Sequence, residues 1–251
     1  MGQAILLAVP CFRESARLPK FLPDLCTAIA DSGLPIQVQP VDDGSGDDEQ
    51  KFLKQYIDEQ RATFSHLSPA HLLDNNVGKG GAVYAGWSNA KEETHLAFVD
   101  ADGAVPAEEV VRLCETALEG GNRAKCVYAT RIGGEGTVVQ RTLVRKFSGW
   151  IFATLVQFLY SLPFRDTQCG FKIVPRAAYE RIRDRTRENR FCFDIEVTSL
   201  LIQSGTEVLA IPINWSEKPG STLKVGNVAS MFLSVIRLRQ RLRRALVNGR
   251  E

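Results

Sequence analysis

The sequence lacks the cysteine and histidine patterns of proteins held together by zinc or by disulfides. Its six cysteines include no closely spaced pair, and its three histidines form no cluster with the spacing of metal ligands. Structural zinc sites and disulfide frameworks need such patterns, so both are disfavoured. We expect reduced thiols that are mostly buried.

Targeting segments and long hydrophobic runs are also missing. Residues 1–10 have no basic region and too short an apolar run for a signal peptide, which predicts a cytoplasmic protein. The most apolar later stretch, Gly149 to Phe164, is too short for a spanning helix and is interrupted by Thr154, Gln157 and Ser161. We therefore expect no membrane span.

Two common nucleotide-binding motifs are absent. No GxGxxG follows the first predicted strand, which disfavours a dinucleotide-dependent dehydrogenase. The segment 76–81 (NVGKGG) is not a Walker A loop, because Leu73 replaces the first glycine and Gly80 replaces the Ser or Thr. An ATPase is thereby disfavoured, although this segment opens a predicted helix and presents backbone N–H groups and Lys79 to an anion.

The sequence does contain a regular alternation of strand and helix patterns in its first half. Apolar runs typical of strands occupy residues 4–9, 36–41, 70–73, 95–99 and 125–130, and helical patterns occupy residues 18–31, 47–59, 80–92 and 106–119. This alternation predicts an α/β fold with a mostly parallel sheet. The second half is predicted to form a long apolar helix, a compact turn at 165–172, a helix at 194–203, a strand at 207–213 and a final helix from about 227.

Polar residues follow the first two predicted strands, where α/β sheets bind their ligands. They are Pro10 to Glu14 and the pair Asp42 and Asp43. Two adjacent carboxylates can accept hydrogen bonds from a base N–H and from ribose hydroxyls. An Asx turn that caps the next helix explains the sequence DDGS equally well.

The sharpest polar cluster is Asp100-Ala101-Asp102 at the end of an apolar strand. Residues i and i+2 of an extended chain point to one face, so both carboxylates can approach a single site. Mg²⁺ typically takes one or two protein carboxylates and completes its shell with phosphates and water. The pattern therefore favours a metal ion on a nucleotide diphosphate, and an ordinary polar turn is the alternative.

In their order and spacing, these segments resemble family 2 glycosyltransferases with a GT-A fold. The second half resembles dolichyl-phosphate glucosyltransferases and related polyprenyl-phosphate mannosyltransferases. It does so through Arg131, Arg145 to Ser148, Arg165 to Lys172 (RDTQCGFK), Phe193 to Glu196 (FDIE), Asn214-Trp215 and Gly220-Ser221. Of these, DTQCGFK is the most specific string.

The resemblance implies a Rossmann-like, mostly parallel sheet flanked by helices, with a C-terminal helical acceptor region. Residues 1–225 would form the GT-A catalytic domain, with a nucleotide-sugar half at 1–130 and an acceptor half at 131–225. Residues 226–251 would form a basic helix.

Residue roles are implied in the same way. The nucleoside would be held by Asp42 and Asp43, with Pro10 and Glu14 near the base and Lys79 helping to frame it. Asp102 would bind Mg²⁺ or Mn²⁺ directly, and Asp100 would contact the ribose or a metal-bound water. Arg131 and Arg145 would gather the acceptor phosphate and donor diphosphate, and Ser148 would donate a hydrogen bond nearby. Two departures stand out: Cys11-Phe12-Arg13 replaces the commoner Xaa-Tyr-Asn, and no hydrophobic anchor helix precedes the first strand.

The implied activity is metal-dependent, inverting transfer of a hexose, glucose from UDP-glucose, to a polyprenyl or dolichyl phosphate. A phosphate monoester is mostly dianionic at pH 7 and needs arginines more than a general base. Three alternatives stay open: a hydroxyl acceptor with Asp166 or Asp194 as general base, a polyprenyl-phosphate mannosyltransferase that uses GDP-mannose, and a catalytically silent nucleotide-binding module that docks on membranes.

Two features suggest a membrane surface as a partner. The formal net charge of +2 decides nothing by itself, but Arg237, Arg239, Arg241, Arg243 and Arg244 cluster near the end of the chain. Together with the apolar stretch 150–159 they predict peripheral attachment to the cytoplasmic face of a membrane. A solvated helix face and a core helix are the alternatives. No nucleic-acid partner is expected.

Overall fold

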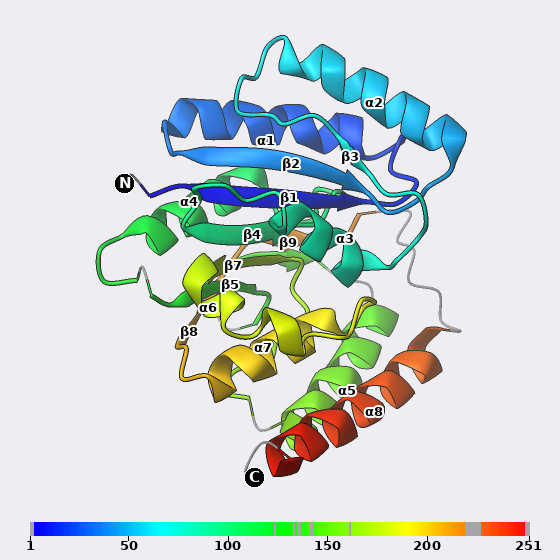
Figure 1. The fold of residues 1–251 in the computed structure, drawn as a ribbon, viewed down its shortest axis with the longest axis vertical. Coiled ribbons are helices and arrows are strands. Elements are labelled where there is room, and N and C mark those ends of the chain that lie inside the picture. Colours follow the sequence, from blue (N-terminus) through cyan, green and yellow to red (C-terminus); the bar gives the residue numbers. More distant parts are fainter. Residues whose placement is uncertain are drawn as a thin grey trace.

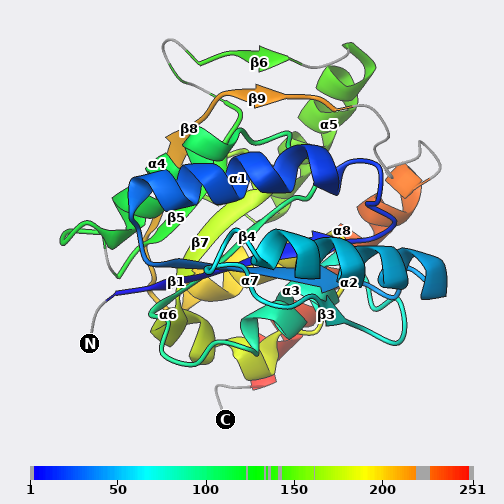
Figure 2. The ribbon, with the colours of Figure 1, turned by 90° about the horizontal axis from the view of Figure 1, so that it is seen from above.

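A computed structural model describes residues 3–122, 124–132, 134, 137–140, 143–160, 162–218 and 227–248. Side chains are described for these residues except 140, 143–150, 227–232 and 245–248. Figures 1 and 2 show a central sheet with helices on both of its faces.

Seven of the described strands form the main sheet, in the order β3, β2, β1, β4, β7, β5, β8. Their bounds are β1 (Ile5–Cys11), β2 (Ile36–Asp42), β3 (His71–Leu72), β4 (His95–Val99), β5 (Cys126–Thr130), β7 (Phe171–Pro175) and β8 (Val208–Pro212). All neighbouring pairs are parallel except those that involve β7. The predicted α/β fold with a mostly parallel sheet is therefore confirmed. A separate parallel pair, β6 (Val139–Gln140) and β9 (Trp215–Ser216), lies beside it (Figure 2).

Strand β7 is the part of the sheet that the sequence analysis missed. It runs antiparallel between β4 and β5, and all five of its residues are buried. The predicted turn at 165–172 was wrong in extending to Lys172, because Phe171 and Lys172 already belong to the strand. A lysine inside a run of five residues conceals the strand pattern, since lysine is almost never fully buried without a partner.

The described helices are α1 (Leu18–Ser32), α2 (Asp47–Arg61), α3 (Lys79–Trp87), α4 (Ala107–Leu118), α5 (Leu143–Tyr160), α6 (Arg176–Glu180), α7 (Phe193–Gln203) and α8 (Asn227–Asn248), with a 3₁₀ turn η1 (Arg183–Arg185). Each predicted helix is present. The helix predicted at 80–92 ends earlier, at Trp87, where hydrogen bonds between residues three apart form a closing turn.

Two hydrophobic cores lie on opposite faces of the sheet. Helices α1, α2 and α4 contribute to the first, and α3, α5, α6, α7 and α8 contribute to the second. Strand β1 serves both: Ile5, Leu7 and Val9 belong to the first core, whereas Leu6 and Ala8 belong to the second. This division follows from the strand geometry, because successive side chains point to opposite faces.

Helices α5 and α8 pack side by side at the end of the molecule remote from α2 (Figure 1). The Tyr160 hydroxyl donates a 2.7 Å hydrogen bond to the Val235 carbonyl and so joins the two helices. Phe152 and Val156 of α5 are buried, whereas Phe158 is 80% exposed. No helix in the described part of the chain has the length and apolarity that a membrane crossing needs.

All six cysteines are buried, in strands, helices and core loops. This confirms the expectation that the thiols are mostly buried. Burial raises the pKa of the Cys126 thiol to about 12, so this group is an unreactive core residue.

Candidate functional site

The residues that follow β1, β2, β4 and β5 meet at the carboxyl edge of the sheet. The first segment contributes Glu14 and Arg17, the second Asp42 and Asp43, the third Asp100 and Asp102, and the fourth Arg131. The parallel pairing of β1 with β2 and β4 brings the first three segments to one edge. Pro10, near the end of β1, pairs with Val41 in this register.

The Asp42-Asp43 pair organises a turn after β2. Asp42 Oδ2 accepts hydrogen bonds from the Ser45 N–H, at 2.9 Å, and from the Gln50 side-chain amide, at 2.8 Å. This is the Asx-turn contact that was the alternative to nucleoside binding. It accounts for the burial of Asp42, which is 2% exposed.

Asp43 joins this turn to the glycine-rich segment before α3. Its carboxylate accepts hydrogen bonds from the backbone N–H groups of Val77, at 2.7 Å, and Gly78, at 3.0 Å. Burial raises the pKa of the Asp43 carboxyl, and these two N–H groups oppose that rise. Gly44 is required between the segments, because it has a φ of +63° and a Cβ there would lie 2.3 Å from the Asn75 carbonyl carbon.

Asp100 lies at the centre of the site. Its Oδ1 is 2.5 Å from the Lys79 ammonium at the start of α3, and its backbone N–H donates to the Gly170 carbonyl at 2.9 Å. A Cβ on Gly170 would lie only 2.1 Å from Asp100 Oδ2. Gly170 is thus the residue of the DTQCGFK string that lets the loop before β7 touch the carboxylate at the end of β4.

Asp102 lies beside Asp100 on the same loop. Its Oδ1 accepts a hydrogen bond from the Ala104 N–H at 3.0 Å, and its Oδ2 is 4.0 Å from an Arg17 nitrogen. Burial raises the pKa of the Asp102 carboxyl, and the negative charge of Asp100 raises it further. The structure therefore brings the two carboxylates close enough to repel each other, although Asp102 lies in a turn and not in the extended strand that the i, i+2 argument assumed.

Lys79 and Glu14 both pair with charged residues inside the protein. Burial disfavours the charged form of Lys79, but the Asp100 carboxylate outweighs this effect and raises the Lys79 pKa. Glu14 receives a 2.7 Å hydrogen bond from Arg17 Nε and forms an ion pair with the same guanidinium. Arg17 was missed by the sequence analysis. Its signal is the i, i+3 spacing to Glu14 in a segment that follows a strand.

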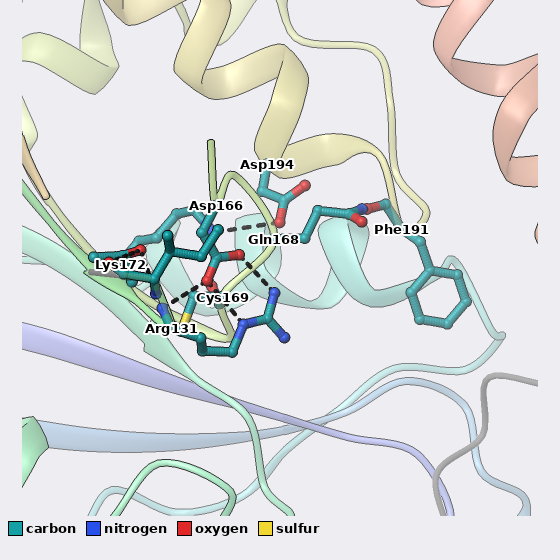
Figure 3. A network of polar contacts seen from close by, with 9 residues as sticks. Arg131, Asp166, Gln168, Cys169, Lys172, Phe191 and Asp194 are labelled. Atoms are coloured by element: carbon teal, nitrogen blue, oxygen red, sulfur yellow. Dashed lines mark hydrogen bonds and ion pairs between the residues drawn. The ribbon is translucent and has the colours of Figure 1, made fainter. Parts of the chain in front are cut away.

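Residues of the segment 165–172 form a network of polar contacts with Arg131, Phe191 and Asp194 (Figure 3). Asp166 binds Arg131 through three hydrogen bonds, from the backbone N–H at 2.7 Å, from Nε at 2.8 Å and from the guanidinium NH2 group at 2.6 Å. Burial alone would raise the pKa of the Asp166 carboxyl, but Arg131 holds it below its usual value. The guanidinium also lies over the Trp215 ring, 5.4 Å from its centre.

Lys172 anchors the same segment to α7. Its ammonium donates to the Cys169 carbonyl at 2.7 Å and lies 3.3 Å from Asp194 Oδ2. Asp194 Oδ1 is buried and has no hydrogen-bond partner among the described residues. Burial raises the Asp194 pKa, and Lys172 opposes this rise. Gln168 adds a hydrogen bond of 3.1 Å to the Phe191 carbonyl.

Arg145 and Ser148 lie outside the described side chains, although their backbone belongs to α5. Gly220 and Ser221 lie outside the described residues altogether. The contacts proposed for Arg145 and Ser148 therefore stay predictions.

The carboxylate oxygens of Asp100 and Asp102 fit a divalent cation whose coordination shell is completed by a bound substrate. The described residues contain no group of three or more His, Cys, Asp or Glu side chains that could hold a metal alone. Two adjacent carboxylates that repel each other are a suitable partial shell, because Mg²⁺ takes few protein ligands and completes its coordination with phosphates and water.

A cavity of about 500 Å³ lies at the other end of α3. Its lining includes Tyr84, Trp87, Arg176, Tyr179 and Arg183 and does not include the carboxylates of the site. The chemistry-bearing residues therefore do not belong to this cavity.

Comparison with known proteins identifies the class to which this site belongs. Residues 7–183 match the family model for glycosyl transferase family 2. The chain therefore belongs to family 2 of the glycosyltransferases, which confirms the resemblance seen in the sequence.

Two relatives and one solved structure show which glycosyltransferases this chain is similar to. A dolichyl-phosphate beta-glucosyltransferase of Trichomonas vaginalis is 30% identical over 240 residues, covering 92% of this chain and 69% of the relative. The dolichyl-phosphate beta-glucosyltransferase of Homo sapiens is 30% identical over 227 residues, covering 86% and 68%. Glucosyl-3-phosphoglycerate synthase from Mycobacterium tuberculosis, in complex with Mn²⁺, UDP and phosphoglyceric acid, superposes with a TM-score of 0.63 at 15% identity, covering 94% of this chain and 77% of the other. At that identity the likeness shows the GT-A type of fold alone.

Proposed function

We propose that this glycosyltransferase transfers glucose, with inversion, from UDP-glucose to a dolichyl or other polyprenyl phosphate. The main support for this proposal is that the DTQCGFK segment and the residues at the end of β4 together form one site. Gly170 contacts Asp100, and Asp166 binds Arg131. Similarity to dolichyl-phosphate beta-glucosyltransferases over most of the chain supports the same substrates.

We assign Asp102 and Asp100 to a bound Mg²⁺ or Mn²⁺. Such an ion, when bound, neutralises the charge that develops on a departing nucleoside diphosphate. Lys79, which is 2.5 Å from Asp100 Oδ1, places a second positive charge next to these carboxylates. The Mn²⁺ and UDP in the complex of the Mycobacterium tuberculosis synthase support this assignment.

The nucleoside would lie between the segments that follow β1 and β2. Pro10 and Glu14 belong to the first segment, and Asp42 and Asp43 belong to the second. Both recorded donors to Asp42 bind its Oδ2, so Oδ1 is the atom that we assign to the nucleoside. Asp43 acts chiefly by holding the turn before α3 in place, through Val77 and Gly78.

The acceptor phosphate would bind near Arg131, Arg145 and Ser148. Asp166 is a poor general base, because Arg131 holds its pKa below the usual value of a carboxyl group. A dianionic phosphate needs no proton acceptor, whereas a sugar hydroxyl does. The Asp166 pair therefore argues against Asp166 as the base of the hydroxyl alternative, and it leaves Asp194, whose pKa burial raises, as the other candidate base.

Peripheral attachment to a membrane would deliver the lipid acceptor. Large apolar side chains are exposed on both helices of the α5 and α8 pair, namely Ile151 and Phe158 on α5 and Leu233 and Ile236 on α8. Arg237, Arg243 and Arg244 are exposed on α8 and would attract anionic lipids. Binding to anionic vesicles at low salt, with loss of binding in Phe158→Glu, is the expected result. Equal recovery of both proteins in the unbound fraction would contradict this attachment.

The proposed division at residues 130 and 225 is one of function. Residues 1–130 would bind the donor, 131–225 the acceptor and 226–251 the membrane. Strand β7, from the second part, lies between β4 and β5 of the first. The two parts therefore share one sheet and are not separate folding units.

The decisive experiment is a transfer assay with radiolabelled donors. UDP-glucose and GDP-mannose are each paired with a polyprenyl phosphate and with a hydroxyl acceptor, with Mn²⁺ or with EDTA. We expect product only from UDP-glucose, polyprenyl phosphate and Mn²⁺, and loss of about 10³-fold or more in activity for Asp102→Asn, because a major electrostatic contribution is removed. Asp184→Asn, at a side chain that is 96% exposed, is the matched control.

The other outcomes of this assay each support one of the alternative functions. Product from GDP-mannose alone identifies a mannosyltransferase, and product only with hydroxyl acceptors removes the lipid assignment. Nucleotide binding without turnover under every condition identifies a silent binding module.

A further inference from the structure

Glu196 of α7 is a buried carboxylate that the proposed mechanism does not use. It is 0% exposed, and its Oε2 accepts hydrogen bonds from the backbone N–H groups of Arg187, at 2.9 Å, and Glu188, at 2.7 Å. Its Oε1 forms an ion pair with the Arg241 guanidinium of α8. A buried carboxylate needs such partners, because an unpaired charge in a protein interior is strongly destabilising.

The loop 187–190 that Glu196 holds lies directly against the start of α3. The Asn189 carbonyl accepts a 3.0 Å hydrogen bond from the Gly81 N–H, and the Glu188 carbonyl accepts one of 3.3 Å from the Tyr84 hydroxyl. A Cβ on Gly78 would lie 2.5 Å from the Asn189 oxygen. The glycines of this segment therefore allow the loop to approach the turn that carries Lys79.

Contacts between α7 and α3 strengthen the same connection. A Cβ on Gly80 would lie 2.4 Å from the Phe193 Cβ, so the two helices touch at the backbone of α3. The Phe193 ring also packs edge-on against Tyr84, with ring centres 6.0 Å apart. A shift of the loop or of α7 would therefore displace the residues at the start of α3.

We propose that Glu196 and Arg241 form a positioning pair that couples the C-terminal helix α8 to the donor-binding turn at residues 77–81. While α8 is seated, Arg241 keeps Glu196 in place, Glu196 holds the loop 187–190, and the loop supports the N-terminus of α3. This proposal rests on the donor site proposed above. Neither Glu196 nor Arg241 touches a reacting atom.

The expected consequence is a selective loss of donor affinity. Without Arg241, Glu196 keeps its two N–H donors but loses the ion pair that the described residues give it, so the loop opens more often and the turn at 77–81 is less well supported. Couplings between separate sites typically change affinity by 5- to 150-fold, and we expect about tenfold here. Turnover at saturating donor should change little, because the carboxylates at the end of β4 are untouched.

The test combines NMR amide exchange with nucleotide binding in the full chain. In Arg241→Met, we expect amide exchange of Gly81, Arg187 and Glu188 to be about tenfold faster, since exchange reports local opening. The Kd for UDP-glucose with Mn²⁺ should rise about tenfold. Arg241→Lys, which keeps the charge, should recover most of both effects.

A second variant and a matched control separate coupling from general destabilisation. In a Glu196→Gln background, Arg241→Met should add little further change, because both substitutions remove the same interaction. Lys125→Gln breaks an ion pair of 2.9 Å with Glu207, where the side chains are 39% and 71% exposed, and should leave both readouts unchanged.

Two results would overturn the proposal: unchanged Gly81 exchange and donor Kd in folded Arg241→Met, or effects of the two substitutions that simply add. Failure of the proposed function would look different. The wild-type protein would then bind no nucleotide sugar, while the exchange rates would still decide whether the pair supports the loop.

Discussion

Substitution of Gly170 by alanine tests the central contact of the site with a single methyl group. The backbone φ of Gly170 lies outside the left-handed region, so alanine introduces no backbone strain there. Its Cβ would instead lie 2.1 Å from Asp100 Oδ2 and 2.5 Å from Asp100 Cγ. The carboxylate must move to make room.

The size of the effect follows from this geometry. Optimal contacts between carbon atoms are about 3.5 to 4.0 Å, so the Asp100 carboxylate must shift by about 1 Å or more. Overpacking of this kind costs about 1 to 3 kcal/mol of stability. A misplacement of about 1 Å in a site can lower the rate about 10²-fold, and that loss of glucosyl transfer is the expected result.

The assay compares Gly170→Ala with Gly120→Ala. A Cβ on Gly120 meets nothing within 4 Å, so this control should change stability by less than about 0.5 kcal/mol and leave transfer unaffected. Stability is measured by urea unfolding, and activity by transfer from radiolabelled UDP-glucose. Wild-type activity in folded Gly170→Ala would refute the argument that Asp100 must occupy this position.

Other predictions concern the buried charges around the site. Asp166→Asn should lower the free energy of unfolding by about 3 kcal/mol near pH 7, because it leaves Arg131 without its counter-charge; an unchanged urea midpoint would contradict this. Because the Asp166 pKa is lowered in the folded state, the contribution of this ion pair to the free energy of unfolding is complete above the unfolded-state pKa of about 3.9. It is lost as the pH falls through the folded-state pKa. The difference in stability between wild type and Asp166→Asn should thus shrink below about pH 4, and a difference that grows on acidification would show the opposite sign. Lys172→Met should cost about 3 to 5 kcal/mol, and adding Asp194→Asn should restore part of it, as thermal unfolding would show. Asp43→Asn should cost about 1 to 3 kcal/mol, because an amide has only one oxygen for the N–H groups that the carboxylate binds; unchanged thermal unfolding would contradict it.

The alternation of apolar and polar runs was sufficient to predict the parallel strands β1, β2, β4 and β5, because the side-chain period of an extended strand is a local property. The DAD segment is different: β4 ends at Val99 and Asp102 lies in a turn, so the extended-strand geometry that was used to predict one site for both carboxylates does not apply to Asp102. The segment DTQCGFK was recognised as a string, but its spacing did not reveal that Gly170 approaches Asp100. That approach depends on β7 lying next to β4, and no local pattern encodes the order of strands in a sheet.

Strand β7 itself was missed because Lys172 interrupts a short apolar run. The lysine is tolerated there because its ammonium donates to the Cys169 carbonyl at 2.7 Å and lies 3.3 Å from Asp194, which belongs to a helix that begins much later in the chain. Arg17 was missed for a related reason, since its contact with Asp102 joins loops that follow different strands.

The sequence alone determined the α/β class, the strand ends that carry polar residues and the family to which the chain belongs. These depend on periodicity within short segments and on strings of residues that can be read in order. Only the tertiary structure decided which charges neutralise one another, such as Arg131 with Asp166 and Arg241 with Glu196. Those pairs join residues that are distant in the chain, and their partners are selected by the packing of whole helices and strands.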